Sequence, residues 1–428
     1  MPEPETPLSE RPWEDVERMV SVDQALELVL ASVCPLPGEP VPILEALGMV
    51  TACDVVAGAD LPPFQNSAMD GYAVRSVDTR GATLETPVRL DVVGSIAAGA
   101  APGLSVRPGQ AIRIMTGASM PANADAVVRF EETDEAAVPK KTSSDRTEIN
   151  ILRGAREMDN VRPAGEDIAF GELAIRSGTK LRPQEIGLLA ALSMPQVVVH
   201  RRPRVAILST GDEVVDIGEE LQPGQIRNSN SYTLAAMAEE TGAIPVVIGI
   251  ARDRFEDLSS KLANCRPCDL IVTSGGVSVG DYDMVKDVLR THGAIDIWQV
   301  RMKPGKPLAF GRIGETPLLG LPGNPVAAAV SFEQFGKPAI RRMLGLQEIL
   351  PRTVQARLTE HIDNLGYRRH YVRAILEGTP KEGYTVRSAG DQGAGVLTSL
   401  TRANALLVIP EHVEAAEPGM TFAVQIMQ

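Results

Sequence analysis

The segment from residue 204 onward alternates short apolar strands with helical patterns, and this alternation constrains the fold more than any other feature. The apolar runs RVAILS, PVVIGI, DLIVTS, AIDIWQV and TPLLGL have the length and the Val, Ile and Leu content of buried strands. Helical patterns over residues 229–241, 254–264 and 283–292 lie between them, and a last helix is expected to begin at Asn324-Pro325. Because this order is typical of a parallel sheet covered on both faces, the sequence predicts a doubly wound α/β domain.

The segments on either side of this domain follow different patterns. A helical pattern over residues 21–33 ends at PLPGEPVP, and short apolar runs broken by Gly and Pro fill residues 51–149. Short strands return after residue 344 and suggest a small β-barrel or sandwich. We therefore predict five parts: an N-terminal tail, helix and linker (1–52), an inserted β-rich domain (53–149), the second part of an elongated linker domain (150–200), the α/β domain (201–344) and a C-terminal β-barrel domain (345–428).

The charge balance and the short apolar runs exclude two classes of partner. The chain has 42 Lys and Arg against 55 Asp and Glu, and no basic block compensates locally, so nucleic acid is excluded. A membrane partner is excluded as well, since no apolar run approaches the roughly 18 residues of a membrane-spanning helix. The acidic, Pro-rich opening lacks the pattern of a secretory signal, and we expect a cytoplasmic protein.

Polar side chains follow the strands of the predicted sheet at the points where the strands end. Glu213 follows the first strand, Asp253 the second, and the loop TSGGVSVG with Asp283 beyond it the third. Ligands of open parallel sheets bind outside the carboxyl ends of the strands, so these groups are expected at one edge. The Gly and Ser residues offer N–H groups and hydroxyls that suit a phosphate or another oxyanion. After the fourth strand, the prolines of KPGKP hold Lys303 and Lys306 on a stiff loop.

Carboxylates beside a phosphate pocket repel the ligand unless a hard cation lies between them. The acidic residues therefore predict Mg²⁺, which is held in proteins by a few carboxylates together with substrate phosphates. The alternative is that these acids occupy the first turns of helices, where the helix dipole favours negative charge. On the first interpretation, the residues predict a Mg²⁺-assisted enzyme that acts on a phosphorylated or nucleotidylated small molecule.

Eight segments in a fixed order resemble one family, the molybdopterin molybdenumtransferases of the MoeA type, which also occur as the E domain of gephyrin-like proteins. The resemblance covers about residues 20 to 425. It rests on PPFQNSAMDGYAVR (62–75), MTGASMPANADAVV (115–128), GEDI (165–168), STGDE (209–213), TSGGVSVGDYD (273–283), KPGKP (303–307), LPGNP (321–325) and ANALLVIP (403–410).

The resemblance implies Mg²⁺-dependent insertion of molybdate into adenylyl-molybdopterin, with release of AMP and molybdenum cofactor. It implies that the α/β domain is the molybdopterin-binding domain. It also implies a homodimer whose cleft joins this domain to the small β domain of the other subunit, with other cofactor-biosynthesis proteins as an open expectation. The candidate catalytic residues are Asp70, Thr116, Asp167, Glu213, Asp253 and Asp283, of which Glu213, Asp253 and Asp283 are the candidate metal ligands. The candidate substrate-binding residues are Ser67, Ser274, Gly275, Gly276, Ser278, Lys303, Lys306, Pro322, Pro325, Arg369, Arg373 and Ser399.

The sequence departs from the family pattern at a few positions. Gln65 stands where the family usually has Asp, Ala394 where Ser is common, and His370 where an acid is common. Gln65 favours an alternative, a catalytically impaired paralogue or scaffold protein of the same fold, because an amide is a poorer base and a poorer Mg²⁺ ligand than a carboxylate. A second alternative, a molybdopterin adenylyltransferase, needs only the α/β domain and is disfavoured by the matching flanking segments.

Overall fold

The structure is a computed structural model that describes residues 19–100, 103–137, 146–263, 265, 268–277, 288–289, 291 and 293–427. The chain forms two units. The large unit comprises Met1–Cys53, Gly178–Arg182 and Val197–Gln428, and the small unit comprises Asp54–Ser177 and Pro183–Gln196. No helix among the described residues is long and apolar enough to cross a membrane.

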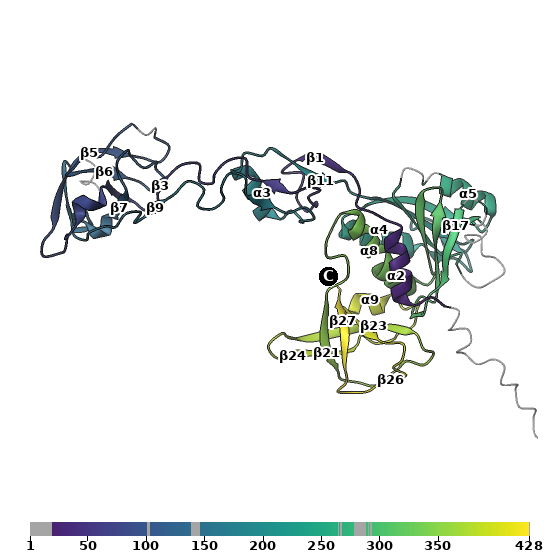
Figure 1. The fold of residues 1–428 in the computed structure, drawn as a ribbon. Helices are drawn as coiled ribbons and strands as arrows, with labels where there is room; N and C mark the ends of the chain where they lie inside the picture. Colours follow the sequence, from purple (N-terminus) through teal and green to yellow (C-terminus); the bar gives the residue numbers. More distant parts are fainter. Residues whose placement is uncertain are drawn as a thin grey trace, which may run out of the picture. The chain divides into compact units, whose positions relative to one another are not determined.

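A six-stranded sheet forms the centre of the α/β domain in the large unit (Figure 1). Its strand order is β15-β12-β16-β20-β19-β17, and the first four strands run parallel. Five strands fall where the sequence predicts them, but β19 was missed, and it runs antiparallel to both of its neighbours. A tight turn at Gly314 and Glu315 joins β19 to β20, so the two strands form a hairpin inside the expected strand–helix pattern. The strands are β12 (Arg204–Thr210), β15 (Ile244–Ala251), β16 (Leu270–Ser274), β17 (Gly293–Gln299), β19 (Pro307–Ile313) and β20 (Thr316–Leu321).

Helices cover both faces of this sheet, which confirms the doubly wound prediction. Alternate residues of β12 face opposite sides: Val205 and Ile207 pack in one apolar cluster, and Ala206 and Leu208 pack in another. The first cluster contains side chains of α2, α4, α7 and α8, and the second contains those of α5. The helix expected over 283–292 lies almost entirely outside the described residues. The helices are α2 (Val22–Ala31), α4 (Ser229–Thr241), α5 (Phe255–Ala263), α7 (Pro325–Ser331) and α8 (Lys337–Met343), with a π-helical turn at Phe332–Gly336.

The start of α2 shows why its sequence forms a helix. Ser21 Oγ accepts a hydrogen bond from the Gln24 N–H (3.2 Å), and Gln24 Oε1 accepts one from the Ser21 N–H (3.1 Å). This capping box satisfies two backbone donors that the first helical turn leaves free. Pro325 begins α7 directly after its N-cap residue Asn324, as the sequence predicts.

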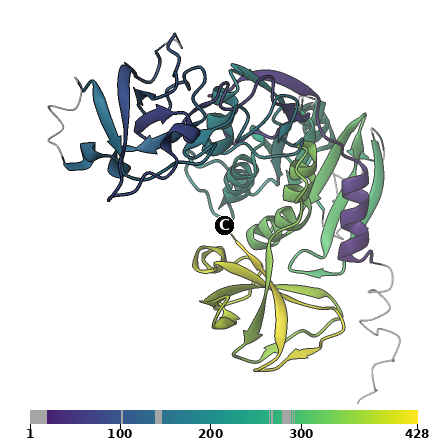
Figure 2. The same ribbon diagram turned by 60° about the vertical axis from the view of Figure 1, so that its left-hand side comes forward.

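The C-terminal region is a closed five-stranded barrel, which resolves the choice between a barrel and a sandwich (Figure 2). The strand order β23-β24-β21-β27-β25 closes because β25 also pairs with β23. A short strand of the KPGKP loop, β18 (Met302–Lys303), pairs in parallel with the start of β23 and so joins the α/β domain to the barrel. The barrel strands are β21 (Thr353–Leu358), β23 (Arg369–Thr379), β24 (Gly383–Ser388), β25 (Ala405–Ile409) and β27 (Thr421–Ile426).

The remaining elements of the large unit are short and lie outside the six-stranded sheet and the barrel. The strands β1, β13 and β22 pair with β11, β14 and β26, respectively. The elements are β1 (Gly38–Pro42), β11 (Gln196–His200), β13 (Val214–Val215), β14 (Ile226–Arg227), β22 (Ile362–Asp363), β26 (Ala415–Ala416) and α9 (Thr398–Arg402).

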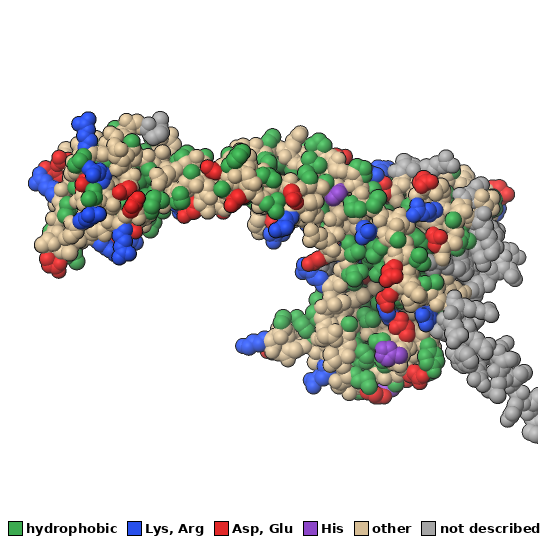
Figure 3. All heavy atoms as spheres, in the orientation of Figure 1, with side chains coloured by type: hydrophobic (Ala, Val, Ile, Leu, Met, Phe, Trp, Pro, Cys, Tyr) green, Lys and Arg blue, Asp and Glu red, His purple; other side chains and the backbone are tan. Residues whose placement is uncertain are grey.

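The small unit is built around a five-stranded sheet of order β7-β4-β6-β5-β8. On the face shown in Figure 3, its basic side chains are interspersed with acidic ones. Its elements are β2 (Val55–Val56), β3 (Asn66–Ser67), β4 (Gly71–Val74), a 3₁₀ turn at Ser76–Thr79, β5 (Val88–Ile96), β6 (Gln110–Ile114), β7 (Ala126–Arg129), 3₁₀ turns at Phe130–Glu132 and Asp134–Ala137, β8 (Glu148–Ile151), β9 (Val161–Arg162), β10 (Leu173–Ile175) and α3 (Pro183–Ala191).

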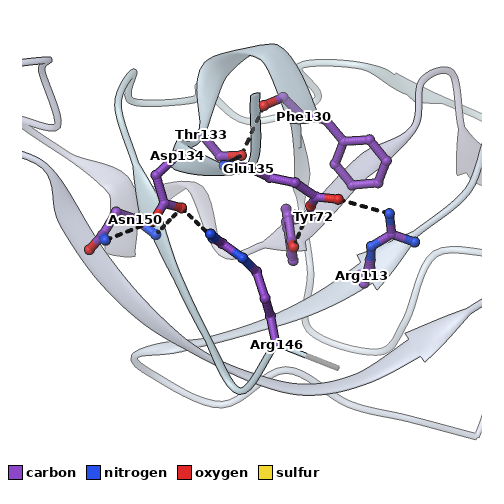
Figure 4. Close-up of polar contacts among 8 residues, drawn as sticks. All are labelled: Tyr72, Arg113, Phe130, Thr133, Asp134, Glu135, Arg146 and Asn150. Carbon is purple, nitrogen blue, oxygen red and sulfur yellow. Dashed lines mark hydrogen bonds and ion pairs between the residues drawn. The ribbon is translucent and has the colours of Figure 1, made fainter. Parts of the chain in front are cut away.

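A network of polar side chains joins two interior strands of this sheet, β4 and β6, to the 3₁₀ turns that follow β7 (Figure 4). Tyr72 Oη donates to Glu135 Oε2 (2.6 Å), and Arg113 donates to Glu135 Oε1 (2.9 Å) while its guanidinium lies 4.4 Å from the centre of the Phe130 ring. Tyr72 is fully buried and Glu135 is nearly so. Burial and the neighbouring Glu135 carboxylate raise the pKa of Tyr72 well above its usual value. The charges of Glu135 and Arg113 therefore neutralise each other within this network.

Candidate functional site

A cavity of about 1000 Å³ lies in the large unit, at the carboxyl ends of β12, β16 and β20. Its walls come from the residues after these strands (209–214, 274–277 and 322–325), from the start of α4 (226–230) and from the KPGKP loop (303–307). The barrel contributes Arg368 and residues 392–397. The cavity is therefore at the edge of the sheet where the sequence places the ligand, and the barrel closes one side of it.

One wall of the cavity carries carboxylates. Glu213 and Asp253 both line it, and Asp212 lies beside them, because its Oδ1 accepts a hydrogen bond from the Asp253 N–H (3.3 Å). Burial, followed by the charges of Asp212 and Glu213, raises the pKa of Asp253 above its usual value. The like charges thus destabilise each other, which is the condition under which a cation between them is favourable.

The chemistry of this wall suits Mg²⁺. Carboxylate oxygens are the ligands that Mg²⁺ prefers, and the ion is commonly held by one or two of them together with waters and substrate phosphates. Glu213 and Asp253 would hold it here. Two of the predicted residues, Ser278 and Asp283, lie outside the described residues. Within the described part of the chain, no group of three or more His, Cys, Asp and Glu side chains is arranged to hold a metal ion.

The loop after β16 contains two successive glycines in left-handed backbone conformations. Gly275 has φ 92° and Gly276 has φ 64°. A Cβ atom on Gly275 would lie 2.7 Å from Thr210 Oγ1 and 2.8 Å from the Thr210 carbonyl oxygen, so this loop and the end of β12 approach too closely for a side chain. Ser274, Gly275 and Gly276 line the cavity, as do Pro322 and Pro325.

Asn230, which sequence reasoning missed, joins three walls of the cavity. Its Nδ2 donates to Ser274 Oγ (2.7 Å) and to the Gly323 carbonyl oxygen (2.8 Å). It stands in the first turn of α4, whose N-cap residue Asn228 accepts a hydrogen bond from the Ser231 N–H (3.2 Å). The polar cluster RNSNS before an apolar helical pattern was the available signal for a capped helix at this place.

Basic side chains lie on another wall of the cavity. Lys303 and Lys306 line it, together with Arg368, a residue that sequence reasoning did not select. Burial, and then the charges of Arg368 and Arg373, lower the pKa of Lys303. Within the described residues, no carboxylate forms an ion pair with Lys303, Arg368 or Arg373. This wall therefore holds partly desolvated positive charge that no carboxylate of the described residues pairs with directly.

Three predicted residues of the barrel are not on the cavity wall. Arg369 instead forms two 2.7 Å contacts with the Asp23 carboxylate and one of 3.2 Å with Glu411. Arg373 is fully buried and donates to Ser399 Oγ (3.2 Å) and to the Gly393 carbonyl oxygen (3.2 Å). Arg368 lines the cavity and Arg369 does not, because the tertiary contacts of β23 decide which of the adjacent arginines faces it; the substrate-binding role of Arg369 stays a prediction.

The predicted residues of the small unit form their own local contacts. Asp70 Oδ1 accepts hydrogen bonds from the Thr116 N–H (2.7 Å) and from Thr116 Oγ1 (2.8 Å). Ser67 Oγ donates to the Met69 carbonyl oxygen (2.6 Å), and Asp167 is exposed. Gln65 Nε2 lies 3.5 Å from Met158 Sδ. The motifs around residues 65–70 and 116 thus meet within this unit.

Comparisons with known proteins match almost the whole chain and agree with the fold. Residues 20–193 match the MoeA N-terminal region (domain I and II), residues 206–342 a probable molybdopterin binding domain, and residues 355–427 the MoeA C-terminal region (domain IV). A molybdopterin molybdenumtransferase of Nostoc sp. is 40% identical over 87% of this chain and 85% of its own length. Molybdopterin molybdenumtransferase 2 of Mycobacterium tuberculosis is 41% identical over 89% of this chain and 92% of its own length.

Solved structures give the same answer. A crystal structure of the molybdopterin biosynthesis MoeA protein from Pyrococcus horikoshii covers 96% of this chain and 100% of its own, with 30% identity and a TM-score of 0.80. A second structure of the Pyrococcus protein has 33% identity and a TM-score of 0.83 over the same shares. With domain models matching from residue 20 to residue 427 and full-length relatives at 40% identity, the chain belongs to the molybdopterin molybdenumtransferase (MoeA) family, the transferases of molybdenum cofactor biosynthesis.

Proposed function

We propose that this chain is a cytoplasmic, Mg²⁺-dependent enzyme that inserts molybdate into adenylyl-molybdopterin and releases AMP and molybdenum cofactor. The observation that carries the proposal is the division of one cavity into an acidic wall and a basic wall. Glu213 and Asp253 lie on the first, and Lys303, Lys306 and Arg368 on the second. A substrate with a diphosphate and a second, oxyanionic substrate need both kinds of wall.

The acidic wall serves the diphosphate of the nucleotidylated substrate. Mg²⁺, when bound there, supplies positive charge that stabilises the diphosphate as AMP leaves. Glu213 and Asp253 hold the charge in place, and Asp283 is the further ligand that the family resemblance implies. The Ser274–Gly276 loop and the first turn of α4 offer hydroxyl and N–H donors to the substrate, since both line the same cavity.

The basic wall serves the molybdate. Lys303 and Arg368 are partly desolvated, and burial lowers the pKa of both. Charge-assisted hydrogen bonds from such groups to an oxyanion are short and strong, because little water competes for them. An anion on this wall also relieves the mutual repulsion of the cations.

A homodimer is part of the proposal. The residues that line the cavity all belong to the large unit, whereas Ser67, Asp70, Thr116 and Asp167 belong to the small one. The family resemblance implies that a second copy supplies the small-unit residues. Mixing an inactive large-unit variant with an inactive small-unit variant should restore activity if they do. A 45.7 kDa species in sedimentation at micromolar concentration would contradict the dimer.

The experiment that tests the reaction is AMP release. The purified chain is incubated with adenylyl-molybdopterin and molybdate across a Mg²⁺ titration, and AMP is measured. We expect AMP to appear only when molybdate and Mg²⁺ are both present. A chain that binds the substrate without releasing AMP would be a scaffold or an impaired paralogue, and a chain that makes adenylyl-molybdopterin from ATP would be an adenylyltransferase. Either result would overturn the proposal.

A further inference from the structure

His370 is a buried histidine whose two ring nitrogens lack hydrogen-bond partners. The side chain is 2% exposed, and neither Nδ1 nor Nε2 has a partner among the described residues. A neutral imidazole always carries one N–H donor and one acceptor, and burying these groups without partners is unfavourable. Such a residue in the interior points to a role other than stabilising the fold.

The strand register places His370 next to the basic wall. In the pairing of β18 with β23, His370 lies opposite Lys303, and the neighbouring pair is Met302 with Arg369. Two residues further along β23, Val372 has the same orientation and packs in the barrel core. His370 thus lies at the end of the barrel interior, paired with the lysine that lines the cavity.

The charges that act on His370 are all positive. Burial is the largest cause that lowers the pKa of His370 to about 3, and the charges of Lys303, Arg373 and Arg368 act in the same direction. Two acids act on other members of the group: Asp363 on Lys303, and Asp391 on Arg373. Arg373 also has a buried nitrogen, Nη1, without a partner. At neutral pH the imidazole is uncharged and supplies no counter-ion to these three cations.

We propose that His370 determines how strongly the basic wall binds an oxyanion, because an uncharged side chain at this position leaves Lys303, Arg368 and Arg373 to be neutralised by the ligand. This inference rests on the proposed function, which assigns the basic wall to molybdate. A carboxylate in place of His370 would pair with the same cations from inside the protein and compete with the bound anion. A neutral amide would not.

Molybdate binding to the full-length chain tests the proposal, measured by calorimetry without the pterin substrate. We expect His370→Glu to weaken binding by roughly tenfold or more, because an internal carboxylate replaces the ligand as counter-charge. His370→Gln, the matched neutral control, should bind within about threefold of the wild type. Equal binding by the wild type and His370→Glu would overturn the inference.

The Lys303→Ala variant separates this inference from the proposed function. If Lys303→Ala loses molybdate binding while His370→Glu retains it, the basic wall is correctly assigned and the role of His370 is wrong. If Lys303→Ala and His370→Glu both bind like the wild type, the assignment of the wall is wrong as well. A wild-type chain that binds no molybdate at all would overturn both.

A measurement on the wild type remains available if His370→Glu does not fold. Histidine ring carbons are labelled with ¹³C, and the signal of His370 is identified by its absence from His370→Gln. We expect this signal to shift when molybdate is added and its pKa to rise, because a nearby anion favours the protonated ring. A signal that is unchanged at saturating molybdate would contradict the proposal.

Discussion

Two clusters of charged and polar side chains in this molecule differ in whether their charges are paired within the protein. In the small unit, Glu135 accepts hydrogen bonds from Tyr72 and Arg113, and every charge of the network has a partner (Figure 4). On the basic wall of the large unit, Lys303 and Arg368 are partly desolvated without a carboxylate partner among the described residues. The first arrangement stabilises the fold, and the second has a cost that only a ligand can offset. The difference separates a structural network from a binding site.

The largest effect is expected where a charge of the paired network is removed. Glu135→Gln leaves the partly buried Arg113 without its carboxylate and should lower the free energy of unfolding by about 3 kcal/mol. The matched control is Glu148→Gln, whose partner Arg89 is exposed, and it should change the free energy by less than about 1 kcal/mol. Denaturant unfolding of both variants checks the contrast. Equal stability of the two variants would mean that burial does not distinguish these ion pairs.

Removing a charged side chain from the basic wall should weaken ligand binding without lowering the stability of the fold. Lys303→Ala should weaken molybdate or substrate binding roughly ten- to a hundredfold, the loss of about 1.5 to 3 kcal/mol for a charge-assisted contact. Lys306→Ala should act in the same direction. Unfolding should be unchanged or slightly harder, because a repelling cation is gone. Lys381→Ala, on an exposed turn, is the control. A loss of stability without a change in the Michaelis constants would contradict the assignment.

Asn230 lies in the same cavity as the unpaired cations, but its side chain is hydrogen-bonded. It therefore tests whether a residue of the cavity can also stabilise the fold. Asn230→Ala removes hydrogen bonds to Ser274 and Gly323 and should lower the free energy of unfolding by about 1 to 2 kcal/mol. Because the three walls are then less fixed, adenylyl-molybdopterin should bind several times more weakly. Glu239→Ala, at an exposed position of the same helix that does not line the cavity, is the control. Unchanged stability and unchanged substrate binding would show that the three loops hold their positions without this clamp.

The sequence predicted those parts of the fold and the site that depend on local pattern. The strands Arg204–Thr210 and Ile244–Ala251 are apolar runs of the right length, and the rule that ligands bind at the carboxyl ends of strands then placed Glu213 and Asp253 at the cavity. The register of β18 against β23 is a tertiary feature with no local signal. For this reason sequence reasoning selected Arg369, which pairs with Asp23, and missed Arg368.

The smallest effect on stability is expected at Asp253, and it has the opposite sign. Burial and the charges of Asp212 and Glu213 raise the pKa of Asp253 in the folded chain, so the folded state binds a proton more tightly than the unfolded state does. The Asp253 carboxylate therefore lowers the free energy of unfolding as the pH rises from the ordinary pKa of an aspartate through the raised pKa of the folded state. This loss of stability is fully present at neutral pH. Asp253→Asn should stabilise the free protein at pH 7, by less than about 1 kcal/mol because water screens a partly exposed group.

This gain in stability should vanish below the ordinary pKa of an aspartate, where the wild-type side chain is protonated in both states. At pH 7, with Mg²⁺ and substrates present, the same variant should release AMP more slowly, because a neutral amide is a poor ligand for Mg²⁺. Unfolding curves at pH 7 and near pH 3, together with AMP release, check both parts. A variant that is less stable than the wild type at pH 7 would show that Asp253 is a satisfied structural acid. The acidic wall would then resemble the network around Glu135 in the small unit, where the charges are paired. Only the basic wall of the cavity would still differ from that network.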